Sequence, residues 1–318
     1  MLNCRKFAGI DVGRKSIKVV QVEKCKNQWC VKNFWSVKRS ENLLAAFNSI
    51  KGDLRKYKAV IGIPNDRALY RKTELPQMKS RELRQAIFWE KRELLKELGG
   101  EYVADYEITK ATDRTFEILM AAVPKNDVMD YLYLAKESGV ALEAIDVYPL
   151  AISRVFTSLF PEKNFAVVDI GAVRTEITLF YRGRVDFSHS VLLGGDDMTS
   201  LLAKFFSIDE SEAESIKIYS GDYRDKVKRC LVPLLDHLTL QIVNCIKHFR
   251  QINGEEVETV VFTGGGGKLS GLREYFFNQT KIETFLADEL DFPHIKIDRG
   301  FDKMEFSCAL GYALKGAF

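Results

Sequence analysis

Two short segments of the chain share nearly the same pattern, and this repeat constrains the fold more than any other feature. Residues 7–22 read FAGIDVGRKSIKVVQV, and residues 166–181 read AVVDIGAVRTEITLFY. In each segment an apolar run reaches an acid and a glycine, a short polar loop follows, and a second β-type run begins. Each segment therefore predicts a β-hairpin with an acidic turn. An internal repeat of this kind indicates two related half-molecules that face one another.

The composition indicates a globular chain, because 318 residues with 46% hydrophobic content can bury a sizeable core. The net charge is +3, from 47 basic and 44 acidic residues, and this balance does not favour a nucleic-acid surface. No apolar run reaches the ~20 residues that cross a bilayer. The first residues, MLNCRKF, lack the apolar core of a signal peptide. We therefore expect a cytoplasmic protein that reaches a membrane only through partners.

The six cysteines are scattered, without a CxxC pair, and the chain has only four histidines. This spacing favours buried apolar side chains or unreactive thiols over a zinc or redox site. The cysteines are Cys4, Cys25, Cys30, Cys230, Cys245 and Cys308.

The remaining pattern predicts an α/β chain with an insertion. Strand-type runs and one helix fill the first quarter. A charged amphipathic helix and paired strands then predict a compact subdomain with its own small sheet between about Pro76 and Asp146. Helices follow the second hairpin, including a long one over about residues 226–251.

The two hairpin turns have the chemistry of a phosphate site. Glycine lets backbone N–H groups approach a ligand closely, and these groups bind phosphate oxygens. An aspartate beside them would repel phosphate unless a cation intervened, and Mg²⁺ held largely through water resolves the conflict. We therefore predict that Asp11 and Asp169 organise Mg²⁺, and that residues 13–16 and 171–175 hold a phosphate tail. For either hairpin alone a simple turn remains the alternative, since Asp and Gly are common turn residues.

A third segment lies far along the chain. Residues 260–272, VVFTGGGGKLSGL, place a glycine run between a buried-type strand and the start of a helix. There the backbone can lie against a flat ligand and N–H groups can face a phosphate. A glycine run alone is a weak signal, but with two acidic hairpins before it the pattern indicates a nucleotide cleft.

These three segments resemble the two phosphate loops and the adenosine loop of the actin-like ATPases, which include actin, the heat-shock chaperones and sugar kinases. Within that superfamily the chain is most similar to the PilM family of type IV pilus assembly proteins, relatives of the division protein FtsA. The similarity continues through residues 61–95, 116–151, 191–218 and 306–314, so it covers nearly the whole chain in order.

The resemblance implies an α/β, actin-like (ribonuclease H-like) fold of two lobes with an inserted FtsA-type small subdomain. It assigns residues 1–76, 147–164 and 303–318 to the first lobe and 77–146 to the insertion. It assigns residues 165–205 and 257–302 to the core of the second lobe and 206–256 to a helical subdomain of that lobe.

The resemblance also adds site residues. Gly194, Gly195 and Asp196 match a double-glycine turn near the phosphates, and Glu214 and Lys217 look like the pair that approaches ribose and base. Without the resemblance, the helix that carries this pair reads as a solvated charged face. The predicted nucleotide-binding residues are Asp11, Gly13, Arg14, Lys15, Ser16, Lys18, Asp169, Gly171, Ala172, Thr175, Gly194, Gly195, Asp196, Glu214, Lys217, Gly264, Gly265, Gly266 and Lys268.

Several positions depart from the superfamily pattern. Arg14 and Lys15 stand in a loop that is usually rich in serine, and Val173 and Arg174 stand where small hydroxyl residues are usual. Tyr148 stands where an acid or amide often polarises the attacking water, and a phenol is a poor general base near neutral pH. We therefore expect binding of ATP and Mg²⁺ with at most slow hydrolysis, and we assign no catalytic residue.

The resemblance implies a component of the inner-membrane assembly platform of a type IV pilus or related secretion system, with nucleotide-dependent closure of the lobes. Its main partner would be the cytoplasmic N-terminal peptide of a PilN-like inner-membrane protein, held in a groove beside the insertion. Phe88, Trp89 and Leu94 are candidates for that groove, although such a helix face is also typical of a core. Other pilus assembly proteins and self-association are further expected contacts.

Three alternatives stay open. An FtsA-like filament protein would need an amphipathic membrane-binding tail, and GYALKGAF is short and weakly basic for that role. A small-molecule kinase would need a catalytic acid, for which no motif is present. A scaffold of the same fold that no longer binds nucleotide is the third, because fold does not determine function.

Overall fold

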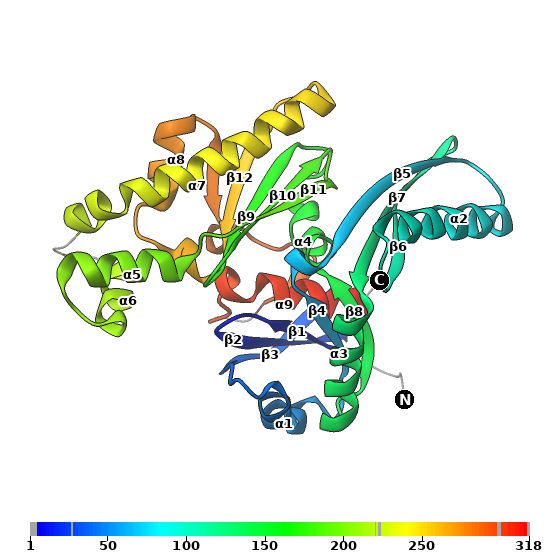
Figure 1. The fold of residues 1–318 in the computed structure, drawn as a ribbon, viewed down its shortest axis with the longest axis horizontal. Helices are drawn as coiled ribbons and strands as arrows, with labels where there is room; N and C mark the ends of the chain where they lie inside the picture. The colour runs from blue at the N-terminus through cyan, green and yellow to red at the C-terminus, as the bar shows by residue number, and fades with distance from the viewer. Residues whose placement is uncertain (1–4, 27, 220, 222–223, 298–299, 317–318) are drawn as a thin grey trace.

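The computed structural model describes residues 5–26, 28–219, 221, 224–297 and 300–316. Cys4 and the last two residues of the predicted first lobe therefore lie outside the described residues. Figure 1 shows two α/β lobes, one above the other, and a smaller sheet with one helix that projects to the side. The predicted α/β architecture of two lobes and an insertion is what the chain forms.

The first lobe is built on a six-stranded sheet in the order β14-β3-β2-β1-β4-β8. Helices α1 (Leu43–Leu54) and α3 (Lys125–Ser138) pack on one face, and α4 (Tyr148–Phe156) and α9 (Lys303–Lys315) pack on the other. The strands are β1 (Lys6–Val12), β2 (Ser16–Cys25), β3 (Gln28–Lys38), β4 (Lys58–Ile63), β8 (Leu142–Val147) and β14 (Ile295–Lys296).

The second lobe repeats this arrangement in a five-stranded sheet in the order β11-β10-β9-β12-β13. As β1 pairs antiparallel with β2 and parallel with β4, so β9 pairs antiparallel with β10 and parallel with β12. The two hairpins predicted from the sequence are thus equivalent parts of two similar sheets. The strands are β9 (Phe165–Ile170), β10 (Thr175–Tyr181), β11 (Arg184–Val191), β12 (Thr259–Thr263) and β13 (Glu283–Leu286). The helices are α5 (Gly195–Phe206), α6 (Glu210–Ile218), α7 (Arg224–Asn253) and α8 (Leu272–Thr280), with short 3₁₀ turns η4 (Gly265–Lys268) and η5 (Ala287–Glu289).

The insertion is a three-stranded sheet in the order β5-β7-β6. Helix α2 (Ser80–Leu98) covers one face of it through Leu83, Ile87 and Leu94. Its strands are β5 (Leu69–Pro76), β6 (Tyr102–Ala111) and β7 (Thr115–Pro124), and a short 3₁₀ turn, η1 (Asn65–Arg67), precedes β5.

Strand pairing moves the limits that were predicted for the subdomains. Strand β5 pairs with β7, so the sheet of the insertion begins at Leu69 and not after Pro76. Strand β8 pairs with β4, and α3 packs on α1, so residues 125–147 belong with the first lobe. Strand β14 pairs with β3, which also returns part of the predicted second lobe to the first. These pairings are long-range, and no local composition change marks them.

Helix α9 joins the two lobes at the centre of the molecule (Figure 1). It lies against β1, β2, β4 and α4 of the first lobe and against β12 of the second. The approach is close: a Cβ atom on Gly9 would lie 1.9 Å from the Ala309 carbonyl oxygen, and one on Gly311 would lie 2.1 Å from the Ala151 carbonyl oxygen. Glycine is therefore required at both positions, because any side chain would push the helix off the sheet.

The cysteines and the helices of the described structure also bear on the predicted class of protein. The five cysteines within the described residues are free thiols, and all except the half-buried Cys25 are buried, as the scattered spacing predicts. None of the helices that the structure describes combines the length and the apolar character needed to cross a bilayer.

Candidate functional site

Asp11 and Asp169 come together in one cavity between the lobes. Each is the next-to-last residue of its strand, Asp11 in β1 and Asp169 in β9. The repeated fold therefore places both acids at the cleft between the lobes. The cavity has a volume of about 160 Å³ and is lined by both hairpin turns. Burial raises the pKa of Asp11, and it raises the pKa of Asp169 to about 6. Lys18 opposes both shifts, and the charge of Asp11 adds to the shift at Asp169.

This arrangement fits a cation that is shared with a ligand. Two carboxylates in one enclosed site disfavour joint ionisation unless a positive charge lies between them. Neither acid forms an ion pair with another described residue. The described part of the chain also lacks any group of three His, Cys, Asp or Glu side chains that could hold a metal unaided. A Mg²⁺ ion held by these carboxylates, water and phosphate suits the donors that are present.

The backbone around the cavity forms a cradle of three loops. The Gly195 and Asp196 N–H groups donate to the carbonyls of Gly171 and Ala172 over 2.9 and 2.8 Å, which docks the second hairpin turn on the double-glycine turn. A Cβ atom on Gly194 would lie 2.3 Å from the Ala172 oxygen, and one on Gly264 would lie 2.3 Å from Asp169 Oδ1. The loops can approach this closely only because glycine occupies both positions.

The predicted residues divide into two groups. The structure places one group on the cavity wall: Asp11, Gly13, Arg14, Lys15, Ser16, Lys18, Asp169, Gly171 and Ala172. The other ten, among them Gly264, Gly265 and Gly266 of the glycine run, do not line the cavity. Thr175 is fully buried and its hydroxyl donates to the Leu193 carbonyl at 2.7 Å, so it supports the turn from within. Lys268 forms ion pairs with Asp302 and Glu305 and so ties the glycine run to α9.

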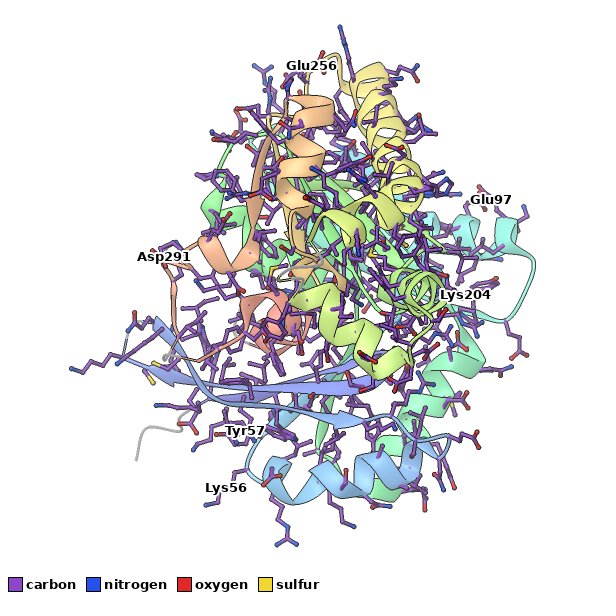
Figure 2. All side chains as sticks on the ribbon, turned by 90° about the vertical axis from the view of Figure 1, so that its left-hand side faces the viewer. Lys56, Tyr57, Glu97, Lys204, Glu256 and Asp291 are labelled. Atoms are coloured by element: carbon purple, nitrogen blue, oxygen red, sulfur yellow. The ribbon has the colours of Figure 1, made fainter. Side chains whose placement is uncertain are left out.

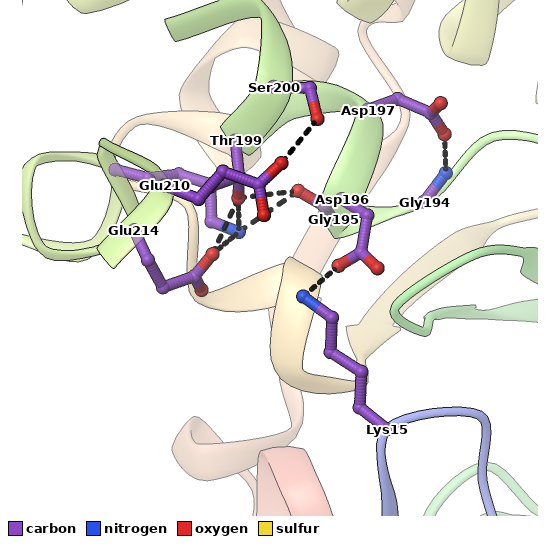
Figure 3. A network of polar contacts seen from close by, with 10 residues as sticks. Lys15, Gly194, Gly195, Asp196, Asp197, Thr199, Ser200, Glu210 and Glu214 are labelled. Carbon is purple, nitrogen blue, oxygen red and sulfur yellow. Dashed lines mark hydrogen bonds and ion pairs between the residues drawn. The ribbon is translucent and has the colours of Figure 1, made fainter. Parts of the chain in front are cut away.

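Lys217 is more deeply buried than the charged-face pattern suggested, with 2% of its surface exposed. Its ammonium donates to Glu214 Oε2 at 2.7 Å, Thr199 Oγ1 at 2.8 Å and the Gly195 carbonyl at 3.1 Å. Figure 3 shows Thr199, Gly195 and Glu214 converging in this network. Lys217 therefore braces the double-glycine turn from behind, while the Glu214 side chain stays 41% exposed. Contact of Glu214 with a ribose stays a prediction.

The unusual charged loop residues make contacts between the lobes. Lys15, in the first hairpin turn, lies 2.5 Å from Asp196 at the start of α5 (Figure 3). Arg174, in the second turn, lies 2.9 Å from Asp66, which precedes β5. Arg14 lines the cavity and has no ion-pair partner among the residues described. The departures from the superfamily pattern thus add charge at the mouth of the cleft and link its two sides.

Tyr148 is a hydrogen-bond donor in this site. Its hydroxyl lies 3.2 Å from Asp169 Oδ2, and its side chain is buried. Burial, and next the charge of Asp169, raise the pKa of the phenol well above its usual range. Tyr148 therefore stays neutral and orients the acid, and it cannot act as a base near neutral pH.

Glu176 is a cavity residue that the sequence reasoning missed. It lies directly opposite Asp169 in the β9–β10 pairing. Its Oε2 accepts from Asn65 Nδ2 at 2.7 Å and from the Ser190 hydroxyl. Burial raises its pKa to about 7, although these hydrogen bonds oppose the shift. The one charged residue in the strand TEITLFY, just after the turn, was the available signal.

Asn65 has an unsatisfied atom at the same place. Its Oδ1 is buried without a hydrogen-bond partner in the described structure, and the residue lines the cavity. A buried polar group of this kind calls for a water, ion or ligand partner.

Comparison with known proteins decides the family. The family model described as "Type IV pilus assembly protein PilM" matches residues 9–316. The chain belongs to the PilM family of type IV pilus assembly proteins. This confirms the predicted family, and the match spans the two hairpins, the insertion and the glycine run together.

Solved structures support the same fold. A "PilM-PilN type IV pilus biogenesis complex" matches with a TM-score of 0.80 at 23% identity, covering 98% of each chain. The ethanolamine utilization protein EutJ from Carboxydothermus hydrogenoformans matches with a TM-score of 0.58 at 17% identity, covering 97% of this chain and 89% of that one. MreB 5 of Spiroplasma citri, bound to AMPPNP, matches with a TM-score of 0.52 at 12% identity, covering 98% and 95%. The predicted actin-like fold is confirmed.

The position of Glu176 predicts how stability depends on pH. Its pKa is about 7 in the folded state against an ordinary value of 4.5, so its neutral form favours folding. This contribution is complete below about pH 4.5 and is lost as the pH rises through about 7, by about 3 kcal/mol in total. We expect the melting temperature to fall between about pH 5 and pH 8 in chelator without nucleotide, and Glu176→Gln to flatten that fall.

The exposed Glu137→Gln is the matched control for this measurement, because it removes an equal charge outside the cavity. Equal slopes for the Glu176→Gln variant and the unmodified protein would contradict the buried position of this acid.

Proposed function

We propose that this protein binds Mg-ATP in the cleft between its lobes and serves as a component of a pilus assembly platform. The observation that supports the cleft most directly is that Asp11 and Asp169 lie in one cavity, beside two hairpin turns whose glycines, Gly13 and Gly171, also line it. MreB 5, a structural neighbour, is described as bound to AMPPNP, and a dehydratase activator with a TM-score of 0.51 as bound to ADPNP.

Three groups of cavity residues have roles in this proposal. Asp11 and Asp169 would hold the cation, mainly through water, and residues 13–16 and 171–172 would face the phosphates. The cation would neutralise phosphate charge. Tyr148 orients Asp169 by its hydrogen bond. Tyr148 stays protonated near neutral pH and cannot act as a general base at its own position, so we propose binding with at most slow hydrolysis.

Nucleotide would then control how the lobes close. Contacts already cross the cleft from Lys15 to Asp196, from Asp66 to Arg174 and from Asn65 to Glu176. A ligand that touches both hairpin turns would favour the closed arrangement, because it binds that state better than an open one.

A calorimetric titration with AMPPNP tests the cation site. In Asp11→Asn and Asp169→Asn we expect the gain in affinity on adding Mg²⁺ to fall at least tenfold, about 1.4 kcal/mol. Binding without Mg²⁺ should not weaken, because each variant removes a negative charge that repels phosphate. The exposed Asp225→Asn on α7 is the control. A Mg²⁺ gain that persists in both variants would exclude these carboxylates, and absence of nucleotide binding by the unmodified protein would favour the scaffold alternative.

We further propose that a PilN-like membrane protein docks at a groove on the other side of the molecule. The similar PilM structure is that of a complex with PilN. A cavity of about 710 Å³ opens where the insertion meets the first lobe. Its apolar wall includes Ile108, which is 39% exposed, and the buried Trp29, Leu150, Phe292 and Leu314. An extended peptide can bury alternate apolar side chains in such a groove.

A buried charge network holds the groove in shape. Arg154, at its floor, lies 2.5 Å from Asp146 of the first lobe and 2.9 Å from Glu107 of the insertion. The Arg154 and Asp146 side chains are almost fully enclosed, so the network holds the insertion firmly against the lobe. A rigid groove lowers the entropic cost of binding a flexible peptide.

The peptide contacts that were predicted on α2 form an alternative docking surface to this groove. Leu94 packs in the core of the insertion and does not line the groove. Phe88 and Trp89 are 60% and 56% exposed, but they do not line the groove.

Two variants separate these surfaces. With the N-terminal peptide of a PilN-like protein, Ile108→Asp should weaken binding at least tenfold, because it places a charge on the apolar wall. Trp89→Asp should leave affinity within about twofold. Fluorescence anisotropy of the labelled peptide measures both. The reverse pattern would move the docking site to α2, and no binding by the unmodified protein would contradict the proposed partner.

A further inference from the structure

A basic hollow lies at the end of the first lobe that is opposite the nucleotide cleft. Asp11, Asn65 and Tyr148 mark the cleft at or just beyond the carboxyl ends of the parallel strands β1, β4 and β8. The hollow, of about 900 Å³, is lined at the amino ends of the same strands by Lys6, Lys58 and Glu143. The two sites therefore face opposite directions.

The charge of the hollow departs from that of the chain. Five of its ten lining residues are basic and one is acidic, whereas the whole chain has 47 basic and 44 acidic residues. The basic residues are Arg5, Lys6, Lys56, Lys58 and Lys315. Lys6 pairs with Glu23 at 2.6 Å, and Lys315 pairs with Asp146 at 3.2 Å and with Glu107 at 3.7 Å. Lys58 pairs with Glu143 at 2.8 Å but keeps 62% of its side chain exposed. Arg5 and Lys56 are exposed and form no ion pair with any residue that the structure describes.

Figure 2 places Lys56 and Tyr57 on the loop after α1, at the lower edge of the molecule. Arg5 precedes β1, and its carbonyl accepts from the Lys24 N–H at 3.1 Å, which fixes its backbone beside β2. The cations thus come from separate elements and converge on one end of the sheet.

The form of the hollow favours a broad anionic surface over a compact phosphate ligand. The end of α9 lies in its wall at Lys315 and Gly316, and the carbonyls at a helix C-terminus repel a closely held anion. The cations are carried on long, flexible side chains, without a glycine loop beside them. Basic residues of this kind are attracted to the anionic leaflet of a membrane, and their contributions to the binding free energy add together.

We propose that this hollow and its rim bind the anionic lipid headgroups of a bilayer and set the orientation of the protein on it, which replaces the expectation that the protein reaches a membrane only through partners. The neighbouring peptide groove supports this orientation, since Leu314 lines the groove and Lys315 lines the hollow. This last step rests on the proposed function, because a peptide that continues into the membrane would bring the same end of the molecule to the lipid surface. The cleft then faces away from the bilayer, open to nucleotide.

Vesicle co-sedimentation tests the proposal. We expect the unmodified protein to bind phosphatidylcholine vesicles that contain phosphatidylglycerol and not to bind vesicles of pure phosphatidylcholine. Added salt should dissociate the protein from the anionic vesicles. The double variant Arg5→Glu/Lys56→Glu should bind the anionic vesicles roughly tenfold more weakly or worse. The control Lys228→Glu/Lys247→Glu changes net charge equally on exposed positions of α7 and should retain binding.

Several outcomes would overturn the proposal. Equal loss of vesicle binding in both double variants would mean that only net charge matters. Undiminished binding by Arg5→Glu/Lys56→Glu would show that the hollow does not bind the vesicles. Displacement by pyrophosphate at matched ionic strength would indicate a soluble phosphate ligand. Binding of AMPPNP and of the PilN-like peptide, measured on the same variants, should be unchanged, which separates this proposal from the proposed function. Should the charge reversal prevent folding, Arg5→Gln/Lys56→Gln supports the same comparison with a smaller expected loss.

Discussion

Two enclosed carboxylates of like charge, one from each lobe, share a single cavity, and the cleft is organised around them. Ionising Asp169 at neutral pH costs on the order of 3 kcal/mol more than in water. Glu176, with a pKa of about 7, adds a third acid to the same place. Such a concentration of acids destabilises the fold when they are ionised, and the proposed cation would offset this repulsion beside the two hairpin turns. The hydrogen bonds from Tyr148 and Asn65 hold two of the acids in position for that cation.

Helix α9 connects this chemistry to the rest of the fold. It packs on β1 within the distance that only Gly9 allows, and its first turn meets Lys268 of the glycine run. Its other end reaches both the peptide groove and the basic hollow. A change in lobe position at the cleft would therefore move a helix whose far end lies at the proposed membrane-facing surfaces. This gives a physical route by which nucleotide could affect partners, without a contact between the two sites.

Local sequence patterns predicted the features of the fold and the site that are formed within one short segment of the chain. Both hairpins and their acids lie at the cavity, and the glycine run follows strand β12 as the sequence suggested, because turn chemistry and strand alternation are local properties. Pairing between distant strands was beyond that reach, so β5 and β8 were placed in the wrong subdomains. The site role of Glu176 depends on Asn65 and Ser190, which other strands and turns supply. The charge pattern of α6 predicted an exposed Lys217. Its burial results from packing against α5, which the sequence pattern of α6 alone does not reveal.

The central claim is that one ligand bridges both hairpin turns through a shared cation. Amide hydrogen exchange measures this most directly, because it reads both turns in one experiment. With Mg²⁺ and AMPPNP, the account predicts slower exchange at residues 13–16 and at residues 171–175 together. With chelator in place of Mg²⁺, AMPPNP should slow exchange at these residues only slightly. Protection confined to one turn, or equal protection without the cation, would contradict it.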